Sequence, residues 1–533
     1  MNKVAPRVPP FKGKKTAPEH KPKPNSFFSN FKSCPDYVDY SQARHGPYSD
    51  GPLELPYMRP DERCRTFTSE AVEKVVADLV SRIPDLDLAR LVENCLPNTL
   101  DTTVLWKTEA EAFIVTGDIH AEWLRDAARQ LSVYQPLARY DPALLKLIRS
   151  AIATQTQFVL NSPYCNAFQP PVRSGLEPSK PSTDKVFPKV PWKVVFECKW
   201  ELDSLASFLT LSNEYYASTG DASFVTEEWL RALETVLKVL TRQSVATYDE
   251  NGAVNPFYYT FQRDTNIGSE TLPLAGTGNP VNYGTGLVRS AFRPSDDACI
   301  LQLFVPANAH MAVELTKTAD MLREASKSEK VSKIVTACQK FAQTIRQGIY
   351  DHAVVNHPVF GEVFAYEVDG FGGTVHMDDA NIPSLLSLPD LGFLDRSDTV
   401  YQNTRKMVLS KRGNPYYQTG SYFEAIGGPH VGIHSAWPMA ALMRIRTSDN
   451  AEEIAENLEM LKKTTGGLGL MHETVNVNSK GGVAYSRPWF AWCNSEFGKT
   501  ILDLAKRMPE VVFGEGAEAY DINEAFRDWT TQG

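Results

Sequence analysis

The feature that most constrains the fold is a succession of helix-length windows in which apolar residues recur every three or four positions. The first window, residues 69–83, opens with Ser69, a residue type that commonly caps helices. Such windows predict roughly a dozen helices and therefore a mainly α fold. The others span residues 121–134, 142–160, 199–217, 225–242, 305–323, 329–350, 398–410, 433–447, 451–464 and 494–508.

Strand signals are short and sparse by comparison. No change of composition divides the chain after about residue 65, and paired helices recur at intervals of roughly 40 to 60 residues. We therefore predict one large domain of stacked helix pairs over residues 61–533, with a few short strands in its loops. The Pro- and Lys-rich start of the chain predicts a disordered or extended N-terminal segment over residues 1–60. The candidate strands are residues 103–107, 112–117, 363–368 and 482–486.

The net charge and the cysteine pattern limit the classes of function that the chain can have. A net charge of -9 argues against nucleic acid or an anionic membrane as partner, because phosphate binding needs clustered excess Lys and Arg. The eight cysteines form no CxxC pair, so no zinc site is predicted, although one or two disulfides fit the pattern. We find no apolar run of the length that a signal peptide or a membrane span requires. A small neutral or polar substrate fits best.

The unusual residues gather in the loops between the predicted helices. Each of these loops mixes a carboxylate, His or Arg with Trp, Phe or Gly, and loops of a rigid scaffold commonly hold binding and catalytic groups. Carboxylates beside aromatic rings favour carbohydrate chemistry, in which rings pack on sugar C–H faces and two carboxyls act as acid and base. The segments are TGDIHAEWLRDAAR (116–129), KWELDSL (199–205), FRPSDDA (292–298), HMDDANIP (376–383), GGPHVGIHSAWPM (427–439), MHETVN (471–476) and SRPWFAWCNSEF (486–497).

The first of these segments surrounds Trp123 with charged residues. Asp118, Glu122, Arg125 and Asp126 lie near it, and the three- and four-residue spacing from Glu122 puts Arg125 and Asp126 on neighbouring helical positions. They fit a sugar site. A capped helix start with a surface Arg/Glu pair explains them equally well.

Two other acidic segments have structural interpretations. For Glu201 and Asp203 we favour carboxylates that complement a helix dipole, although Asp203 could orient a substrate-binding Arg. Asp378 and Asp379, next to His376, could cap a short helix, bind a metal or hold a sugar. Because a calcium loop needs more oxygen ligands at short spacing, no metal site is predicted.

Glu473 is the general-base candidate. It follows His472 in a glycine-flanked loop, and Arg487, Trp489 and Trp492 come shortly after it. The second His of an HExxH motif is missing, so a zinc protease is excluded.

Six of these motifs, in this order, resemble the motif set of glycoside hydrolase family 125, whose members are exo-acting α-1,6-mannosidases, and the chain resembles a fungal member. The motifs are TGDIHAEWLRD, FRPSDDA followed by VPANAH, HMDDANIPSLLSLPDLGF, HVGIHSAWPM, MHETVN and RPWFAWCNSEFG. The match covers about residues 100–510 and leaves the first 60 or so outside it. The resemblance implies an (α/α)6 toroid and an inverting hydrolysis that needs neither metal nor cofactor.

The resemblance also implies catalytic roles. The general base falls on Glu473 and the general acid on one residue of the pair Asp296 and Asp297. A poorly solvated site and an ionised neighbour would keep that acid protonated. Which aspartate it is stays open, with Asp297 preferred. Glu473 would activate the attacking water, and inversion requires the two carboxyls to lie roughly 6.5 to 9.5 Å apart.

Further residues are candidate substrate contacts by the same resemblance. Trp489 and Trp492 could form an aromatic wall or pack between helices, and each candidate His could instead be a core residue. The full set is Asp118, Trp123, Arg125, Asp126, Arg293, His376, Asp378, Asp379, His434, His472, Arg487 and Trp489.

Three alternatives remain in view. One is a related toroid glycosidase or phosphorylase acting on another sugar, although Glu473 stands where a phosphorylase needs a phosphate site. The second is a non-catalytic mannoside-binding relative, which would be expected to lack an acid or base candidate. The third, a helical scaffold for protein partners, does not explain the acidic and aromatic loops.

The expected partner is a mannose-containing oligosaccharide or glycan. The sequence does not determine which glycan this is, nor the oligomeric state of the protein. The lack of a signal peptide and of any N-x-[ST] sequon favours the cytoplasm, whereas mannosidases are expected to meet their glycans in the secretory route or outside the cell. The compartment is therefore left open.

Overall fold

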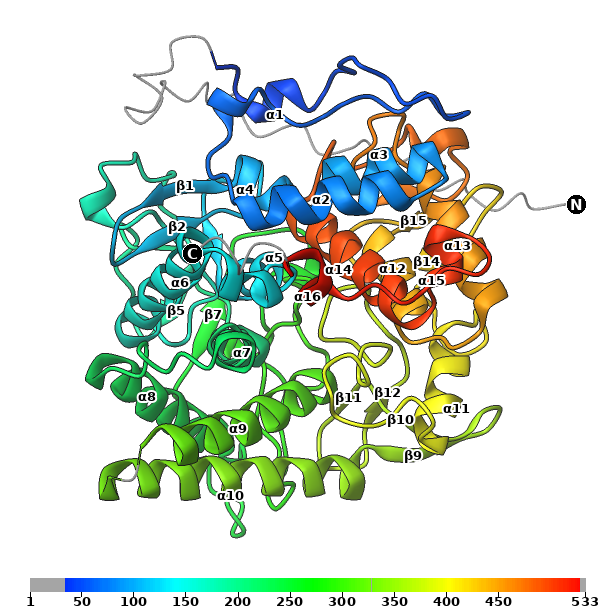
Figure 1. The fold of residues 1–533 in the computed structure, drawn as a ribbon. Helices are drawn as coiled ribbons and strands as arrows, with labels where there is room; N and C mark the ends of the chain where they lie inside the picture. The colour runs from blue at the N-terminus through cyan, green and yellow to red at the C-terminus, as the bar shows by residue number, and fades with distance from the viewer. Residues whose placement is uncertain (1–33, 327, 528–533) are drawn as a thin grey trace, which may run out of the picture.

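The computed structural model describes residues 34–326 and 328–527 and is mainly helical (Figure 1). The helices are α1 (Tyr37–Tyr40), α2 (Glu70–Arg82), α3 (Leu86–Cys95), α4 (Asn98–Thr102), α5 (Leu124–Ser132), α6 (Pro142–Asn161), α7 (Leu202–Thr219), α8 (Glu227–Gln243), α9 (Val305–Ala325), α10 (Glu329–His352), α11 (Thr399–Val408), α12 (Pro438–Arg446), α13 (Ala451–Lys462), α14 (Ala491–Arg507), α15 (Pro509–Phe513) and α16 (Ile522–Ala525).

The long helices form two concentric layers. In the inner layer α5 packs on α7 and α7 on α9, while α14 packs on both α12 and α5. In the outer layer α6 packs on α8, and α10 lies along α9 at the lower edge of Figure 1. Every residue of α5 is buried, whereas α8 buries one face, as expected for an inner and an outer helix. This is the predicted (α/α)6 toroid.

Buried ion pairs tie the inner layer together. Arg129 of α5 donates through Nε to Glu496 of α14 at 2.8 Å and lies 3.2 Å from Asp390. Arg446 of α12 pairs with the same two carboxylates. Asp390 belongs to a series of turns between α10 and α11, so these ion pairs join the turns to α5 and α12.

All the predicted helical windows contain helices. Among the described residues, five helices lie outside these windows, namely α1, α3, α4, α15 and α16. The helix expected over residues 433–447 begins only at Pro438, because Ser435 and Ala436 pair with Asn476 and Val475 as a two-stranded ladder before the chain enters α12. Proline suits the first helical position, since its missing N–H would have no partner there.

The strands are short and confined to loops. They are β1 (Val104–Lys107), β2 (Ala112–Ile114), β3 (Glu122–Trp123), β4 (Ala167–Phe168), β5 (Lys185–Phe187), β6 (Val195–Glu197), β7 (Thr260–Gln262), β8 (Leu303–Phe304), β9 (Val354–His357), β10 (Gly361–Phe364), β11 (Glu367–Val368), β12 (Thr374–Val375), β13 (Tyr417–Thr419), β14 (Glu424–Ile426), β15 (Ser435–Ala436) and β16 (Val475–Asn476). They form small antiparallel sheets, of which β3–β4–β6 and β12–β11–β8 have three strands.

Three of the four predicted strands are confirmed, with residues 363–368 split between β10 and β11. The strand predicted over residues 482–486 is wrong. Only Tyr485 forms a bridge there, with Val475, because Gly481 and Gly482 adopt left-handed φ angles of 70° and 72° that turn the chain out of an extended path.

The described part of the N-terminal segment, residues 34–60, has little regular structure and runs alongside α2 and α3 (Figure 1). The phenolic OH of Tyr37 donates to the carbonyl of Met58, and the N–H of Met58 donates to Asn94 of α3. The predicted domain boundary near residue 60 stays a prediction, and residues 1–33 lie outside the described residues.

Two disulfides are present, Cys34–Cys64 and Cys165–Cys198. The second links the residue that precedes β4 by two positions to the residue that follows β6. Over the described ranges, no helix has the length and apolar character that crossing a membrane would demand.

Candidate active site

A cavity of about 420 Å³, partly open to solvent, lies where the N-terminal ends of several inner helices meet. Trp123, Trp437 and Phe490 line it, and they are the N-cap residues of α5, α12 and α14. Glu201, the N-cap of α7, lies close behind. Helix N-termini carry partial positive charge, so this end of the ring favours carboxylates.

Six of the predicted site residues line this cavity: Asp296, Glu473, Trp123, Arg125, Asp126 and Arg487. They come from four segments that fall in three distant regions of the sequence, around residues 123, 296 and 480, so the expected convergence on one pocket is observed. The remaining lining residues are Thr116, Ile119, Pro294, Ser295, Asn381, His430, Trp437, Phe490 and Trp492. Sequence reasoning assigned no role to His430 or Trp437, although both lie in the quoted segment GGPHVGIHSAWPM.

Arg125 is the centre of a buried cluster of carboxylates. Its NH1 donates to Glu201 at 2.6 Å and to Asp203 at 3.1 Å. Its NH2 lies 3.5 Å from Asp126 and 3.8 Å from Asp296. Of the two interpretations of Glu201 and Asp203, the one in which Asp203 orients an Arg describes this arrangement.

The amide of Asn166 connects a second group of carboxylates. Its Nδ2 lies within hydrogen-bond distance of Glu197 at 3.0 Å, Glu201 at 3.1 Å and Asp296 at 3.3 Å. Lys199 donates from Nζ to the backbone carbonyl of Asp296 and lies 3.3 Å from Glu197. Both Asn166 and Lys199 directly follow a cysteine of the Cys165–Cys198 disulfide, which therefore holds together the two segments that present them.

These buried carboxylates outnumber the neighbouring cations, so protons must balance part of the charge. Burial raises the pKa of Glu201 well above its usual range despite Arg125, and the hydrogen-bonded Asp296 raises it further. Burial likewise raises the pKa of Asp203, to about 6. Burial would also raise the pKa of Asp296, but Lys199 and Arg125 outweigh it and keep this pKa below its usual value. The two pKa shifts have opposite directions, so Glu201 is the more readily protonated member of the pair Glu201–Asp296.

The adjacent residues Asp296 and Asp297 have different surroundings. Asp296 adopts a left-handed φ of 66° in a tight turn closed by Arg293, whose N–H donates to the carbonyl of Asp297. As a result the side chain of Asp296, 36% exposed, faces the cavity. The side chain of Asp297 is buried, and its Oδ2 lies 2.7 Å from Nδ1 of His430.

Asp297 lies behind the cavity surface and forms an ion pair with His430, which lines the cavity. Burial would lower the pKa of His430, but the hydrogen bond and charge of Asp297 outweigh it and raise this pKa to about 9. Burial acts on Asp297 in the opposite direction, and His430 overcomes it to lower the carboxyl pKa.

Glu473 is held in the cavity wall by two neighbours. Ser486 donates to its Oε2 at 2.7 Å, and Nε of Arg487 lies 3.7 Å from Oε1. Arg487 also lies 3.5 Å from Asp118, so Asp118 acts on the cavity through Arg487 and is not itself part of the lining.

Three further predicted residues lie behind the cavity. Arg293 is buried and donates to Glu367 at 2.6 Å. Asp378 accepts from two backbone N–H groups, those of Leu385 and Leu386, in a segment of turns, so the short helix that it was expected to cap does not form. Asp379 accepts from Ser295, which does line the cavity, at 2.6 Å.

The remaining candidates are placed away from the cavity. His376 packs edge-on against His357, and His434 is exposed. His472 is buried with Nδ1 at 2.9 Å from the carbonyl of Arg487, and burial lowers its pKa to about 4.

Of the two tryptophans considered for an aromatic wall, only Trp492 lines the cavity. It lies under the guanidinium of Arg125, 5.4 Å from the ring centre. Trp489 packs instead against Tyr37 of the N-terminal segment.

The helix pairs form a toroid, and carboxylates, Arg and aromatic rings cluster at the end of it where the inner helices begin. This is the arrangement of a glycoside hydrolase. The family model of the metal-independent α-mannosidases of glycoside hydrolase family 125 matches residues 85–502. The chain belongs to this family, and the function class expected from its motifs is confirmed at the level of a metal-independent α-mannosidase. No group of three or more His, Cys, Asp or Glu side chains suited to a metal occurs within residues 34–326 and 328–527.

Two relatives add detail. The chain is 50% identical over 488 residues to the meiotically up-regulated gene 157 protein of Schizosaccharomyces pombe, with 90% of this chain and 94% of that protein covered. A metal-independent α-mannosidase of Streptococcus pneumoniae, solved in a non-productive complex with α-1,6-mannobiose, superposes with a TM-score of 0.75. It is 31% identical, and the match covers 82% of this chain and 99% of that one.

Proposed function

We propose that the protein is an exo-acting α-mannosidase that removes non-reducing terminal α-1,6-linked mannose with inversion. The observation that carries the proposal is that Asp296 and Glu473 line one cavity together with Arg125 and Asp126. The α-1,6-mannobiose bound by the Streptococcus pneumoniae relative supports the linkage.

We assign Asp296 as the general acid and Glu473 as the general base. Sequence reasoning preferred Asp297, but a general acid must reach the glycosidic oxygen, and the geometry favours the aspartate that faces the cavity. Glu201 passes the proton of the pair to Asp296, and Asp296 gives it to the leaving oxygen as the C–O bond breaks. Glu473 takes a proton from the water that attacks the anomeric carbon from the other face of the sugar.

Polar groups without protein partners suit the sugar hydroxyls. Within the described residues, Oδ2 of Asp126 and Nε1 of Trp123 are buried and have no hydrogen-bond partner. Hydroxyls of the departing mannose would satisfy both groups, which otherwise cost free energy when buried. Trp123, Trp437 and Phe490 supply apolar faces for the C–H side of the ring.

The test is an NMR time course of α-1,6-mannobiose hydrolysis, run on the parent protein, Asp296→Asn, Asp297→Asn and Glu473→Gln in the presence of EDTA. The expected result is initial release of β-mannose by the parent and its loss in Asp296→Asn and Glu473→Gln. Initial release of α-mannose would reject inversion, and inhibition by EDTA would reject the metal-independent reaction for this chain.

The same experiment separates the alternatives. Hydrolysis of α-1,2- or α-1,3-linked mannobiose in preference to the α-1,6 isomer would reject the linkage. Turnover only with inorganic phosphate would indicate a phosphorylase. Saturable mannobiose binding without turnover would indicate a mannoside-binding relative.

A further inference from the structure

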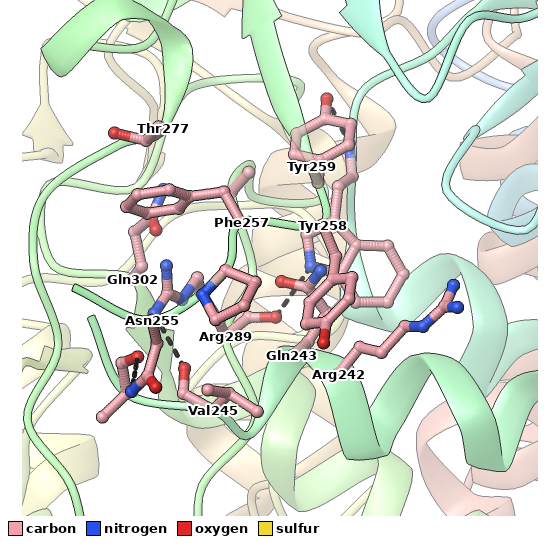
Figure 2. A pocket seen from close by; sticks show the side chains of 14 residues that line it. Arg242, Gln243, Val245, Asn255, Phe257, Tyr258, Tyr259, Thr277, Arg289 and Gln302 are labelled. Carbon is pink, nitrogen blue, oxygen red and sulfur yellow. Dashed lines mark hydrogen bonds between the residues drawn. The ribbon is translucent and has the colours of Figure 1, made fainter. Parts of the chain in front are cut away.

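A second cavity lies between the C-terminal end of α8 and the loop that leads to β7 (Figure 2), and its empty space of about 370 Å³ includes open solvent. The rings of Phe257, Tyr258 and Tyr259 and the side chains of Arg289 and Gln302 line it. Trp200 forms part of the same wall. No residue of this cavity lines the active-site pocket.

The charge in this cavity is of one sign. Arg289 and Arg242 line it, and no Asp or Glu does. Across residues 34–326 and 328–527, no carboxylate lies within ion-pair distance of either guanidinium. A protein with a net charge of -9 thus leaves two arginines at one cavity without a counter-ion.

Arg289 is the buried member of the pair, 8% exposed. One nitrogen, NH2, donates to the carbonyl of Val245 at 3.0 Å and lies 3.4 Å from the hydroxyl of Thr247. Its Nε is buried and has no hydrogen-bond partner among the described residues. Burial without an opposite charge lowers the pKa of Arg289 to about 10. A buried guanidinium that keeps a free donor is costly unless an anion binds to it.

Gln302 adds a neutral donor to the same wall. It is fully buried, and within the described chain neither its amide nitrogen nor its amide oxygen has a hydrogen-bond partner. The amide packs against Gly278, where a Cβ would fall 1.7 Å from Nε2. A glycine at this position therefore leaves the room in which the amide lies. An unsatisfied buried amide beside an unpaired guanidinium is the donor set that oxyanions bind.

We propose that this cavity is a binding site for a small oxyanion, a phosphate or carboxylate group, with Arg289 as its charged contact and the amide of Gln302 as a neutral donor. Arg242 lies at the rim over the ring of Tyr258, 5.0 Å from its centre, and adds attraction at longer range. The site is independent of mannoside hydrolysis, because it shares no residue with the active-site lining.

The test is isothermal titration calorimetry of the parent protein with inorganic phosphate and with acetate, against sodium chloride of equal ionic strength. We expect saturable binding of at least one oxyanion with one site per chain and only dilution heat with chloride. Tighter binding of phosphate would identify a phosphate group as the ligand, and tighter binding of acetate a carboxylate. Heats equal to the chloride blank for both anions would overturn the proposal.

Variants locate the bound anion. Arg289→Gln should weaken binding by about tenfold or more, since it removes the charged donor. Arg242→Gln, the matched control at the rim, should weaken it less than about threefold. Equal losses in the two variants would place the anion at the rim and reject the site.

Two more variants keep the test decisive if Arg289→Gln does not fold. Gln302→Glu places a carboxylate in the cavity, so it should abolish binding of phosphate and acetate, and retained binding would contradict the site. Glu473→Gln should bind the anion as the parent does. This variant separates failure of the anion site from failure of the proposed hydrolysis.

Discussion

The active-site pocket and the Arg289 cavity differ in the sign of their unbalanced charge. In the pocket, the guanidinium of Arg125 is surrounded by four carboxylates, those of Asp126, Glu201, Asp203 and Asp296. In the second cavity, the guanidinium of Arg289 has no carboxylate partner among the described residues.

The comparison shows two ways to accommodate excess buried charge. Carboxylates can bind protons near neutral pH, and burial raises the pKa of both Glu201 and Asp203 accordingly. A guanidinium does not lose its proton at neutral pH, so its charge needs an anion from elsewhere. In the pocket, the raised pKa values favour protonated carboxyls where acid catalysis needs a proton. In the second cavity, the guanidinium without a counter-ion leaves a place for an anionic ligand.

The largest effect that would sharpen the comparison is expected for Asp296→Asn. The change removes the carboxyl that faces the pocket and should lower kcat for α-1,6-mannobiose about 10²- to 10⁴-fold. Asp297→Asn should lower kcat less, because that carboxyl contacts His430 behind the pocket. A greater loss in Asp297→Asn, measured in the same assay, would reverse the assignment.

Replacing each arginine by Met tests the charge difference itself. Arg125→Met leaves buried carboxylates without their partner and should lower the free energy of unfolding by about 3–5 kcal/mol. Arg289→Met removes a charge that has no counter-ion, and it also removes the two hydrogen bonds that Arg289 donates. The change should therefore lower the free energy of unfolding by about 1 kcal/mol or less. Urea unfolding of both variants measures the difference, and equal losses would show that Arg289 has a counter-ion in solution.

Glu201→Gln tests whether the pocket stores a proton. Without Glu201, whose pKa burial raises, the acid proton would depend on Asp296 alone, and Lys199 and Arg125 hold the pKa of Asp296 below its usual value despite burial. The basic limb of the pH profile of kcat should then move to lower pH. Once this limb lies below neutral pH, each further pH unit of the shift should lower kcat at neutral pH about tenfold. Glu424→Gln is the control and should leave the profile unchanged, because Glu424 pairs with Arg444 and does not line the pocket. An unchanged profile in Glu201→Gln would remove Glu201 from the proton path.

The smallest effect is expected for the ion pair between Asp297 and His430. The pKa of His430 is raised to about 9 in the folded protein, against roughly 6.5 when unfolded. Its stabilisation is therefore fully present below about pH 6.5 and is lost as the pH rises through 9. The Tm of the parent should fall over this interval more than that of His430→Gln. Parallel curves would show that His430 is not charged in the native state.

Much of the fold could be predicted from local pattern. Helices such as α6 and α10 have the apolar period and N-terminal caps that identify them, Asp141 and Ser328 respectively. Turn-rich regions were harder. The strand expected over residues 482–486 failed because two glycines turn the chain there, and α3 was missed although Asp85 caps it.

The candidate site was predictable as a set of loops but not as individual contacts. Arg125, Asp126 and Glu473 were singled out and line the pocket, whereas His434 was chosen from a segment in which His430 lies at the pocket. The two histidines are four residues apart in a loop, and sequence spacing does not indicate which side chain turns inward.

The sequence by itself determined the helix periods, the order of the acidic and aromatic motifs, and through them the family. These properties depend on neighbouring residues and on short motifs. Only the tertiary structure decided which of Asp296 and Asp297 faces the pocket, because the choice depends on one left-handed φ angle and on a histidine 133 positions away. It also decided that Arg289 has no counter-ion among the described residues, since charge balance in a buried site depends on segments that meet only when the ring of helices closes.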